Sequence, residues 1–236
     1  MANETRWFLG VDGGERELNF LKTIDGLTRI ESNNVVPAFE HKVKLFLGIP
    51  NANDLIDVHS IEKLANDFLL QIRGLFELCR ISTRCSTLAY SGLFEKKGDL
   101  FHARFPVYAQ KVDVSGCTNP KRFIECVLKM LSDKDIQDVL VFLGCAHVCW
   151  NELSKVFEIC KRCMTDVELS HCFGSKKTQG RFTLTSNHDG SVAGRDARHA
   201  RFNKELPKKP MQLDEARNYI LTGVIRWLHL KKKIDD

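Results

Sequence analysis

The segment SVAGRDARHARF, at residues 191–202, has the residue types best able to act on a phosphodiester. It places Arg195, Arg198 and Arg201 around His199, close behind a glycine. A histidine can move a proton near neutral pH, and an arginine can neutralise the charge that develops on a phosphorane. Three guanidiniums this close repel one another unless carboxylates or phosphates lie among them. The segment therefore predicts a site of RNA cleavage, a phosphate clamp, or a solvated turn.

Within this segment, Arg198 and His199 are the preferred catalytic pair, in which Arg198 holds a phosphate and His199 transfers the proton. Arg181 and His188 form a reserve pair with six residues between them. The structural alternative is an ion pair that pins the turn, since buried charges are usually paired. On that alternative, Arg198 bonds to a carboxylate such as Glu152 or Glu158.

Positive charge is concentrated around this segment. Residues 173–210, the basic segment, contain nine Lys/Arg and three Asp/Glu, a net charge of +6, so the remaining residues sum to −1 of the total of +5. Such a concentration is typical of a surface that binds a polyanion, and the alternative is a solvated basic loop. The residues expected to contact nucleic acid are Arg195, Arg201, Lys208 and Lys209.

Composition sets the class of protein that must position these residues. A chain of 236 residues that is 43% hydrophobic can bury a core. The opening MANETRWFLGVDGG lacks a basic stretch followed by an apolar one, and no later apolar run approaches the roughly 18 residues of a membrane span. Nine cysteines without a secretion signal favour reduced thiols. We expect a cytoplasmic protein with no membrane contact and no cofactor.

The pattern before residue 118 predicts strands and one long helix. Residues 1–55 are expected to be β-rich, with a hairpin turning at V-D-G-G. Apolar residues at helical spacing predict an amphipathic helix over 60–80. Two β-rich runs on either side of Lys97-Gly98 predict a hairpin, inserted at about residues 86–115.

The second half of the chain is expected to contain four or five helices. Asn119-Pro120 begins the first, and further apolar stripes follow within 136–143 and 150–164 and in a last helix after Pro210. The predicted fold class is α+β, with a C-terminal helical bundle, N-terminal strands and an inserted hairpin. We expect a boundary after residue 55 and one continuous core in 56–236 that joins the 60–80 helix to the later helices.

Several stretches of the C-terminal third carry a family resemblance. In order they are WNELSKVFE at 150–158, RFTLTSN at 181–187, GRDARHA at 194–200, PKKPMQLDEA at 207–216 and RWL at 226–228. Together they resemble a family of uncharacterised bacterial proteins with a HEPN-like C-terminal helical domain. The resemblance is clearest over 150–228 and fades before residue 60.

The resemblance implies a function and a site pattern. Many HEPN domains are metal-independent endoribonucleases whose site, completed in a dimer, has an Arg and a His separated by roughly four to six residues. Arg195 and His199 have only three residues between them, and Arg198 is adjacent to His199. Arg181 and His188 satisfy the spacing, although residue frequencies alone supply about 1.5 such matches.

Two other groups of residues have simpler interpretations. Residues 145–172 include five cysteines and two histidines that could hold Zn²⁺, but Cys160 lies on an apolar stripe, which favours core packing. We therefore expect no bound metal. In the hairpin, basic side chains alternate with Phe94, Phe101 and Phe105, a pattern that suits base stacking or a half-buried strand.

Two functions follow from the sequence. The first is a HEPN-like RNA-binding protein or metal-independent endoribonuclease, a toxin or defence component that acts as a homodimer. The second is a non-catalytic helical module that uses the same basic segment to bind a protein or nucleic-acid partner. Cleavage of generic RNA in EDTA, leaving cyclic phosphate ends, distinguishes the two.

Overall fold

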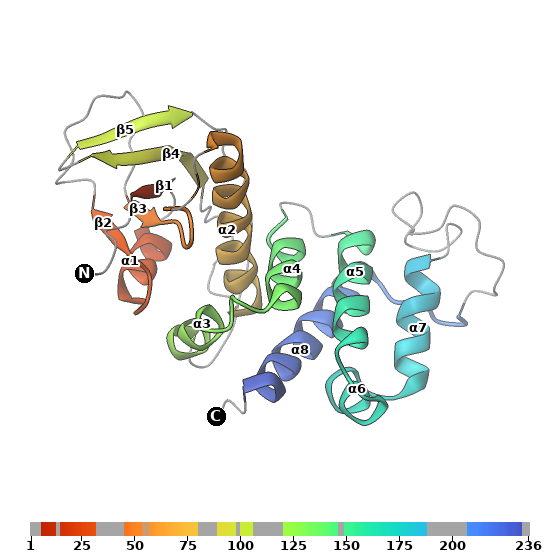
Figure 1. Cartoon of the computed structure of the whole chain (residues 1–236). Helices are drawn as coiled ribbons and strands as arrows, with labels where there is room; N and C mark the ends of the chain where they lie inside the picture. The colour runs from red at the N-terminus through yellow and green to blue at the C-terminus, as the bar shows by residue number, and fades with distance from the viewer. Residues whose placement is uncertain are drawn as a thin grey trace. The chain divides into compact units, whose positions relative to one another are not determined.

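The computed structural model describes residues 6–12, 15–31, 45–53, 55, 57–79, 89–97, 100–105, 120–145, 149–187 and 207–232. Within these residues the chain forms eight α-helices and five β-strands (Figure 1). They fall into two compact units, an N-terminal unit of residues 1–129 and a C-terminal unit of residues 130–236. The combination of helices with an antiparallel sheet confirms the α+β class. In the described part of the chain, every helix is too short or too polar to cross a membrane.

The N-terminal unit is built on an antiparallel sheet of strand order β2-β3-β1-β4-β5. Its central strand, β1 (Trp7–Asp12), pairs with β3 (Leu45–Gly48) and β4 (Ala89–Lys97). The outer strands are β2 (Arg29–Glu31) and β5 (Leu100–Phe105). Apolar side chains are buried at successive positions of β1, so both faces of this strand are covered.

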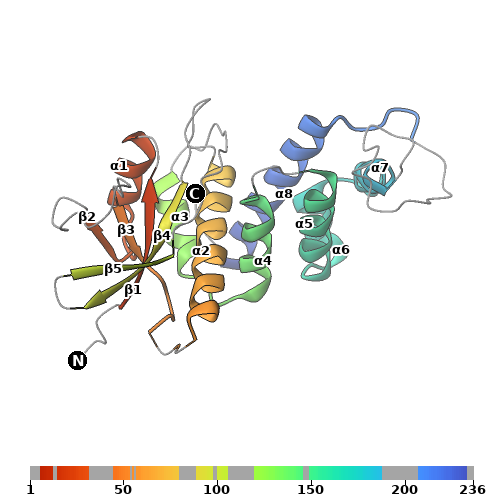
Figure 2. The ribbon, with the colours of Figure 1, turned by 90° about the horizontal axis from the view of Figure 1, so that it is seen from above.

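Three helices accompany this sheet. The longest, α2 (Val58–Cys79), packs against β1, β4 and α3 (Pro120–Leu128) (Figure 2). The ring of Phe20, on α1 (Glu15–Thr23), meets the ring of Phe76 edge-on at 5.8 Å. Both the 60–80 helix and the helix that begins at Asn119-Pro120 are thus confirmed as elements.

The grouping of these elements differs from the predicted one. We expected a boundary after residue 55 and a hairpin inserted in the helical bundle. Instead β4 pairs with β1 from Trp7↔Glu95 to Asp12↔Ala89, so the hairpin completes the N-terminal sheet, and α2 belongs to the same unit. An apolar stripe predicts a buried helix face, but a sheet can cover that face as well as another helix can.

The first turn also differs from its prediction. The V-D-G-G stretch was expected to connect two strands, whereas the residues after it form α1. Leu18 and Leu21 are buried at a spacing of three, which suits a helix, and short apolar runs of this kind fit either structure.

The C-terminal unit is entirely helical in its described part. Its helices are α4 (Lys134–Leu143), α5 (Trp150–Arg162), α6 (Asp166–Phe173), α7 (Lys176–Asn187) and α8 (Leu213–Lys232). This confirms a helical C-terminal region, although α6, only eight residues long, was not predicted. A Thr-x-x-Glu capping box begins α6.

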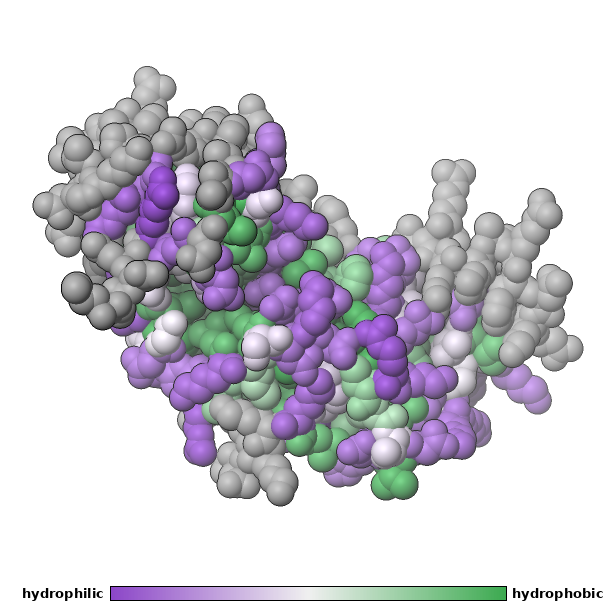
Figure 3. Space-filling model, in the orientation of Figure 1, coloured by the Kyte–Doolittle hydropathy of each residue, from purple (hydrophilic) through white to green (hydrophobic). Residues whose placement is uncertain are grey.

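Aromatic side chains form the core of the C-terminal unit. Phe157 of α5 lies with its ring centroid 5.2 Å from that of Phe173 on α6 and 5.3 Å from that of Phe182 on α7. Tyr219 of α8 packs against Phe173 at 5.8 Å and Phe182 at 5.5 Å. This aromatic cluster therefore joins α5, α6, α7 and α8. On the face drawn in Figure 3, polar residues cover much of the described surface around these helices.

Candidate functional site

The predicted site residues divide into two groups. Three lie in the described part of the chain, Arg181 on α7 and the two lysines that precede α8. The others lie outside the described residues: His188, Arg195, Arg198, His199 and Arg201. The geometry of the site is thus the geometry around Arg181, Lys208 and Lys209.

The guanidinium of Arg181 is bound on several sides by protein oxygens. Its Nε donates to the carbonyl of Lys209 at 2.5 Å, and Nη2 donates to the carbonyl of Pro210 at 3.2 Å. Nη1 and Nη2 also donate to the two carboxylate oxygens of Glu215, at 2.5 and 2.8 Å. This bidentate pair is the strongest form of charge-assisted hydrogen bond. The side chain is 32% exposed, so the pair is half-buried.

A hydroxyl one helical turn further along α7 makes a second connection. Thr185 Oγ1 accepts a hydrogen bond from the buried backbone N–H of Met211 at 3.2 Å. The same hydroxyl donates to the carbonyl of Arg181 at 2.8 Å. Residues at i and i+4 lie on one helix face, so the side chains of Arg181 and Thr185 can both bond to the backbone of residues 209–211. We call this arrangement the α7 clamp: Arg181 and Thr185 hold the backbone of residues 209–211, and Glu215 holds the guanidinium of Arg181.

The α7 clamp holds a turn that presents two cations. The side chains of Lys208 and Lys209 are exposed, and neither forms an ion pair with any residue that the structure describes. Pro207 and Pro210 flank them, and proline rings restrict the backbone on either side. The negative charge of Glu215, which follows the two lysines in the sequence, is neutralised by the ion pair with Arg181. The α7 clamp therefore holds the backbone next to two exposed ammonium groups that can bind phosphate electrostatically.

Two residues of the α7 clamp were not singled out from the sequence. Thr185 stands four residues after Arg181, but that spacing is too common to signal a contact. Glu215 is 34 residues from Arg181 and reads as an acidic residue in the first turn of α8, where it complements the helix dipole. Only the folding of α7 and α8 against α5 and α6 brings these side chains together.

The carboxylates expected to pair with Arg198 lie on α5. Glu152 accepts hydrogen bonds from the backbone N–H of Cys149 at 3.2 Å and from its thiol at 2.6 Å, so it caps the start of α5. Glu158 is exposed on the same helix. The predicted ion pair with Arg198 involves a residue outside the described part and stays a prediction.

The cysteines of residues 145–172 are engaged within the helices. In the part of the chain that the structure describes, no three His, Cys, Asp or Glu residues gather in a metal-binding arrangement; His147 lies outside that part. Burial raises the pKa of the Cys160 thiol well above its usual value and that of Cys172 to about 11. The half-buried thiols donate to nearby oxygens: Cys145 to the Val141 carbonyl, Cys149 to Glu152 and Cys163 to Asp135.

In the β4–β5 hairpin, the described side chains from Leu93 to Glu95 are buried. Phe94 is 5% exposed and meets Phe46 edge-on at 5.0 Å. Glu95 is buried and accepts a hydrogen bond from Arg6 Nε at 2.7 Å. Phe94 is therefore a core residue of the sheet, as the half-buried strand interpretation requires. The side chains of Phe101 and Phe105 lie outside the described part of the chain.

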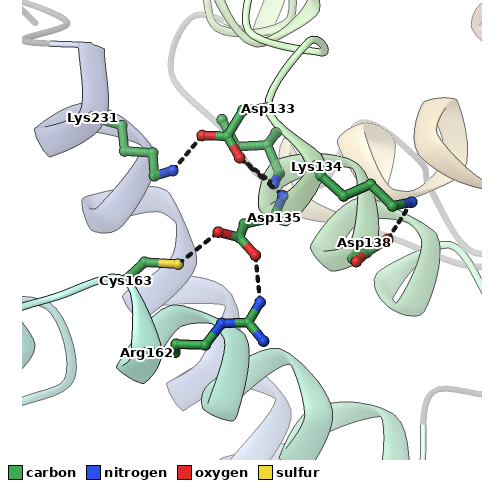
Figure 4. Close-up of polar contacts among 8 residues, drawn as sticks. Asp133, Lys134, Asp135, Asp138, Arg162, Cys163 and Lys231 are labelled. Atoms are coloured by element: carbon green, nitrogen blue, oxygen red, sulfur yellow. Dashed lines mark hydrogen bonds and ion pairs between the residues drawn. The ribbon is translucent and has the colours of Figure 1, made fainter.

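A second group of charged residues links three helices of the C-terminal unit (Figure 4). Asp133 caps α4, accepting from the backbone N–H of Asp135 at 2.9 Å, and bonds to Lys231 of α8. Asp135 accepts from Arg162 at 2.5 Å and from the Cys163 thiol at 3.0 Å, both at the end of α5. Every charge in this group has a partner, so its role is to hold α4, α5 and α8 together.

These contacts lower the pKa values of both carboxyl groups. Partial burial of Asp133 opposes its ionisation, but hydrogen bonds from Lys231 and the backbone outweigh it and lower its pKa below the ordinary 3.8. The Cys163 thiol, with Arg162, lowers the pKa of Asp135. A depressed pKa in the folded state stabilises the fold above the unfolded pKa. The contribution is lost as the pH falls through the folded pKa, so it weakens below about pH 4.

Substitutions at Asp133 separate its two roles. Asp133→Ala removes both the cap and the charge, so we expect a loss of about 1–2 kcal/mol in the free energy of unfolding at pH 7. Asp133→Asn keeps a capping oxygen and removes only the ion pair, so its loss is expected to be about 1 kcal/mol or less and to shrink as the pH falls from 5 to 2. Urea titrations across this pH range measure both. Equal losses for the two variants at pH 7 would contradict the capping role.

No protein-family model matches the chain, and comparisons with curated proteins and with solved structures give no match. The HEPN-like resemblance therefore stays a prediction. What the chain does has to be inferred from the geometry of its own residues.

Proposed function

We propose that the C-terminal unit binds RNA through the phosphate backbone. The Lys208–Lys209 turn is the described part of the site, and Arg195 and Arg201, which lie in the same basic segment of the sequence, are proposed as further contacts. The α7 clamp is the observation that carries this proposal. Lysines on a backbone fixed by hydrogen bonds lose less freedom on binding than lysines on a loose loop, and phosphate contacts supply most of the affinity for nucleic acid.

The contacts of Arg181 favour binding over catalysis by the reserve pair. A guanidinium that stabilises a phosphorane must direct its N–H groups at the phosphate. Those of Arg181 are directed at Glu215 and at two carbonyls. The enzymatic alternative assigns catalysis to Arg198 and His199, whereas the homodimer and the toxin or defence role rest on the resemblance alone.

The binding proposal predicts a specific loss when the two lysines are replaced. Lys208→Ala/Lys209→Ala is expected to weaken binding of a 20-nucleotide single-stranded RNA about tenfold at low salt. The slope of log affinity against log salt concentration should become shallower by roughly 0.7 for each phosphate that the variant no longer neutralises. Fluorescence anisotropy of end-labelled RNA at several salt concentrations measures both quantities.

A matched variant tests whether position or charge alone matters. Lys129→Ala/Lys161→Ala makes the same change in net charge, and both of these lysines are exposed. We expect this variant to keep nearly the affinity and salt slope of the wild type. Equal losses in the two double variants would mean that any surface lysine contributes and would reject the turn as the site.

The same preparations test the enzymatic alternative. RNA is incubated with the full chain in EDTA, and the products are examined for cyclic phosphate ends. Cleavage that both Arg198→Ala and His199→Ala abolish, without loss of RNA affinity in the His199 variant, would establish a metal-independent endoribonuclease. Binding without cleavage supports the non-catalytic function.

A further inference from the structure

We infer that Arg181 is a positioning residue for the RNA site: it fixes the Lys208–Lys209 turn from α7 and does not itself bind the phosphate. The inference rests on the proposed function of that turn. It goes further by giving Arg181, which the sequence suggested as a catalytic arginine, a different role in the same unit.

The first argument is that the hydrogen bonds of Arg181 are already committed. Four bonds, to Lys209, Pro210 and both oxygens of Glu215, use four of the five N–H groups of a guanidinium. A phosphate could accept a hydrogen bond from the one remaining N–H group. To form a bidentate pair with the guanidinium, it would have to displace the carboxylate of Glu215. Such displacement exchanges one charge-assisted pair for another and gains little.

The second argument is the place where these bonds act. Arg181 binds the carbonyl of Lys209 itself and the carbonyl of the next residue, while Thr185 binds the N–H of Met211. Met211 is 1% exposed, so the backbone leaving the turn is anchored in the core. The direction in which the Lys209 side chain leaves the backbone is therefore set by α7.

The third argument is electrostatic. The first turn of α8 contains two carboxylates, Asp214 and Glu215, close in sequence to the lysines. Arg181 pairs with Glu215, which removes one of the two negative charges that would repel a phosphate chain. Arg181 thus supports RNA binding both through the backbone of the turn and through the charge beside it.

A double-mutant cycle tests the inference. Arg181→Gln is made in the wild type and in the Lys208→Ala/Lys209→Ala background, and the affinity for the same 20-nucleotide RNA is measured. A positioning role predicts roughly a fivefold to tenfold loss in the wild type but less than twofold in the double-lysine background, because no lysine is left to position. The same fold loss in both backgrounds would overturn the inference.

Glu215→Gln separates positioning from direct phosphate contact. This substitution releases Arg181 from its carboxylate and removes one negative charge. If Arg181 bound phosphate directly, RNA affinity would rise; if it positions the turn, affinity stays level or falls, because the weakened anchor offsets the gain in charge. Tighter binding by Glu215→Gln would therefore count against the inference.

Two controls keep the result interpretable. Lys231→Ala removes an ion pair and a cation–π interaction elsewhere in the C-terminal unit, and it should lower the melting temperature without changing RNA affinity. If Arg181→Gln does not fold, Arg181→Lys keeps the charge but not the bidentate geometry, and as a positioning residue it should lose affinity. A lysine can still neutralise a phosphate, so affinity close to that of the wild type in Arg181→Lys would instead indicate direct binding.

The two proposals fail in different ways. If the wild type does not bind RNA, or the double-lysine variant binds as well as the wild type, the proposed function itself is rejected. If the lysines matter and Arg181→Gln binds like the wild type, only the positioning role is rejected.

Discussion

Gly223→Ala is expected to destabilise the C-terminal unit by about 1–3 kcal/mol, although the same exchange stabilises most helices. Gly223 is buried in α8, and a Cβ at this position would lie 2.6 Å from Cζ of Phe173 and closer still to Cδ1 and Cε1. The ring cannot easily yield, because it is 1% exposed and packs against Phe157 and Tyr219. The clash therefore outweighs the gain in helix propensity.

A second glycine provides the matched control. Gly180 lies in α7, and a Cβ there meets nothing within 4 Å, so Gly180→Ala should stabilise the unit by about 0.5–1 kcal/mol. In a Trp7→Phe background the remaining tryptophans, Trp150 and Trp227, both belong to the C-terminal unit, so their fluorescence in urea reports its unfolding. If both glycine variants were stabilised, α6 and α8 would not pack as closely as the structure shows.

These two glycines illustrate which features of the fold the sequence can predict and which it cannot. The apolar spacing of residues 60–80 and 150–164 predicted α2 and α5, because helix periodicity is a local property. The partner of each face is not local. The apolar residues of α2 do not indicate that β1 and β4 cover them. Likewise, the sequence around Gly223 does not indicate that the ring of Phe173, fifty residues earlier, lies against this glycine.

The candidate site was predictable to a similar degree. Net charge directed attention to the basic segment as a region, since charge can be counted along a sequence. The role of Arg181 could not be inferred in this way, because an arginine that binds phosphate and one that binds Glu215 look alike before folding. Spacing between Arg and His was the weakest guide, since chance alone supplies such pairs.

Phe157→Ala is expected to have the largest effect of the substitutions considered, a loss of about 3–5 kcal/mol in the free energy of unfolding of the C-terminal unit. Phe157 is 5% exposed, and its ring contacts those of Phe173, Phe182 and Tyr219, each on a different helix. Removing the ring leaves a cavity bordered by three other aromatic side chains. These cannot collapse into it without moving their helices, so little of the loss is recovered.

The matched control is the phenylalanine of α4. Phe142 is only half-buried, and the ammonium of Lys155 lies 4.9 Å from its ring centroid, so Phe142→Ala should cost about 1–2 kcal/mol. The same tryptophan fluorescence measures both variants, and similar losses would argue against the aromatic cluster as the centre of the core. The consequence reaches the proposed RNA site, because Phe182 precedes Thr185 on α7 and follows Arg181 directly. In the Phe157→Ala variant, at urea concentrations where it remains folded, hydrogen exchange should therefore speed up more at α7 than at α4, since Phe182 of α7 packs on this cluster.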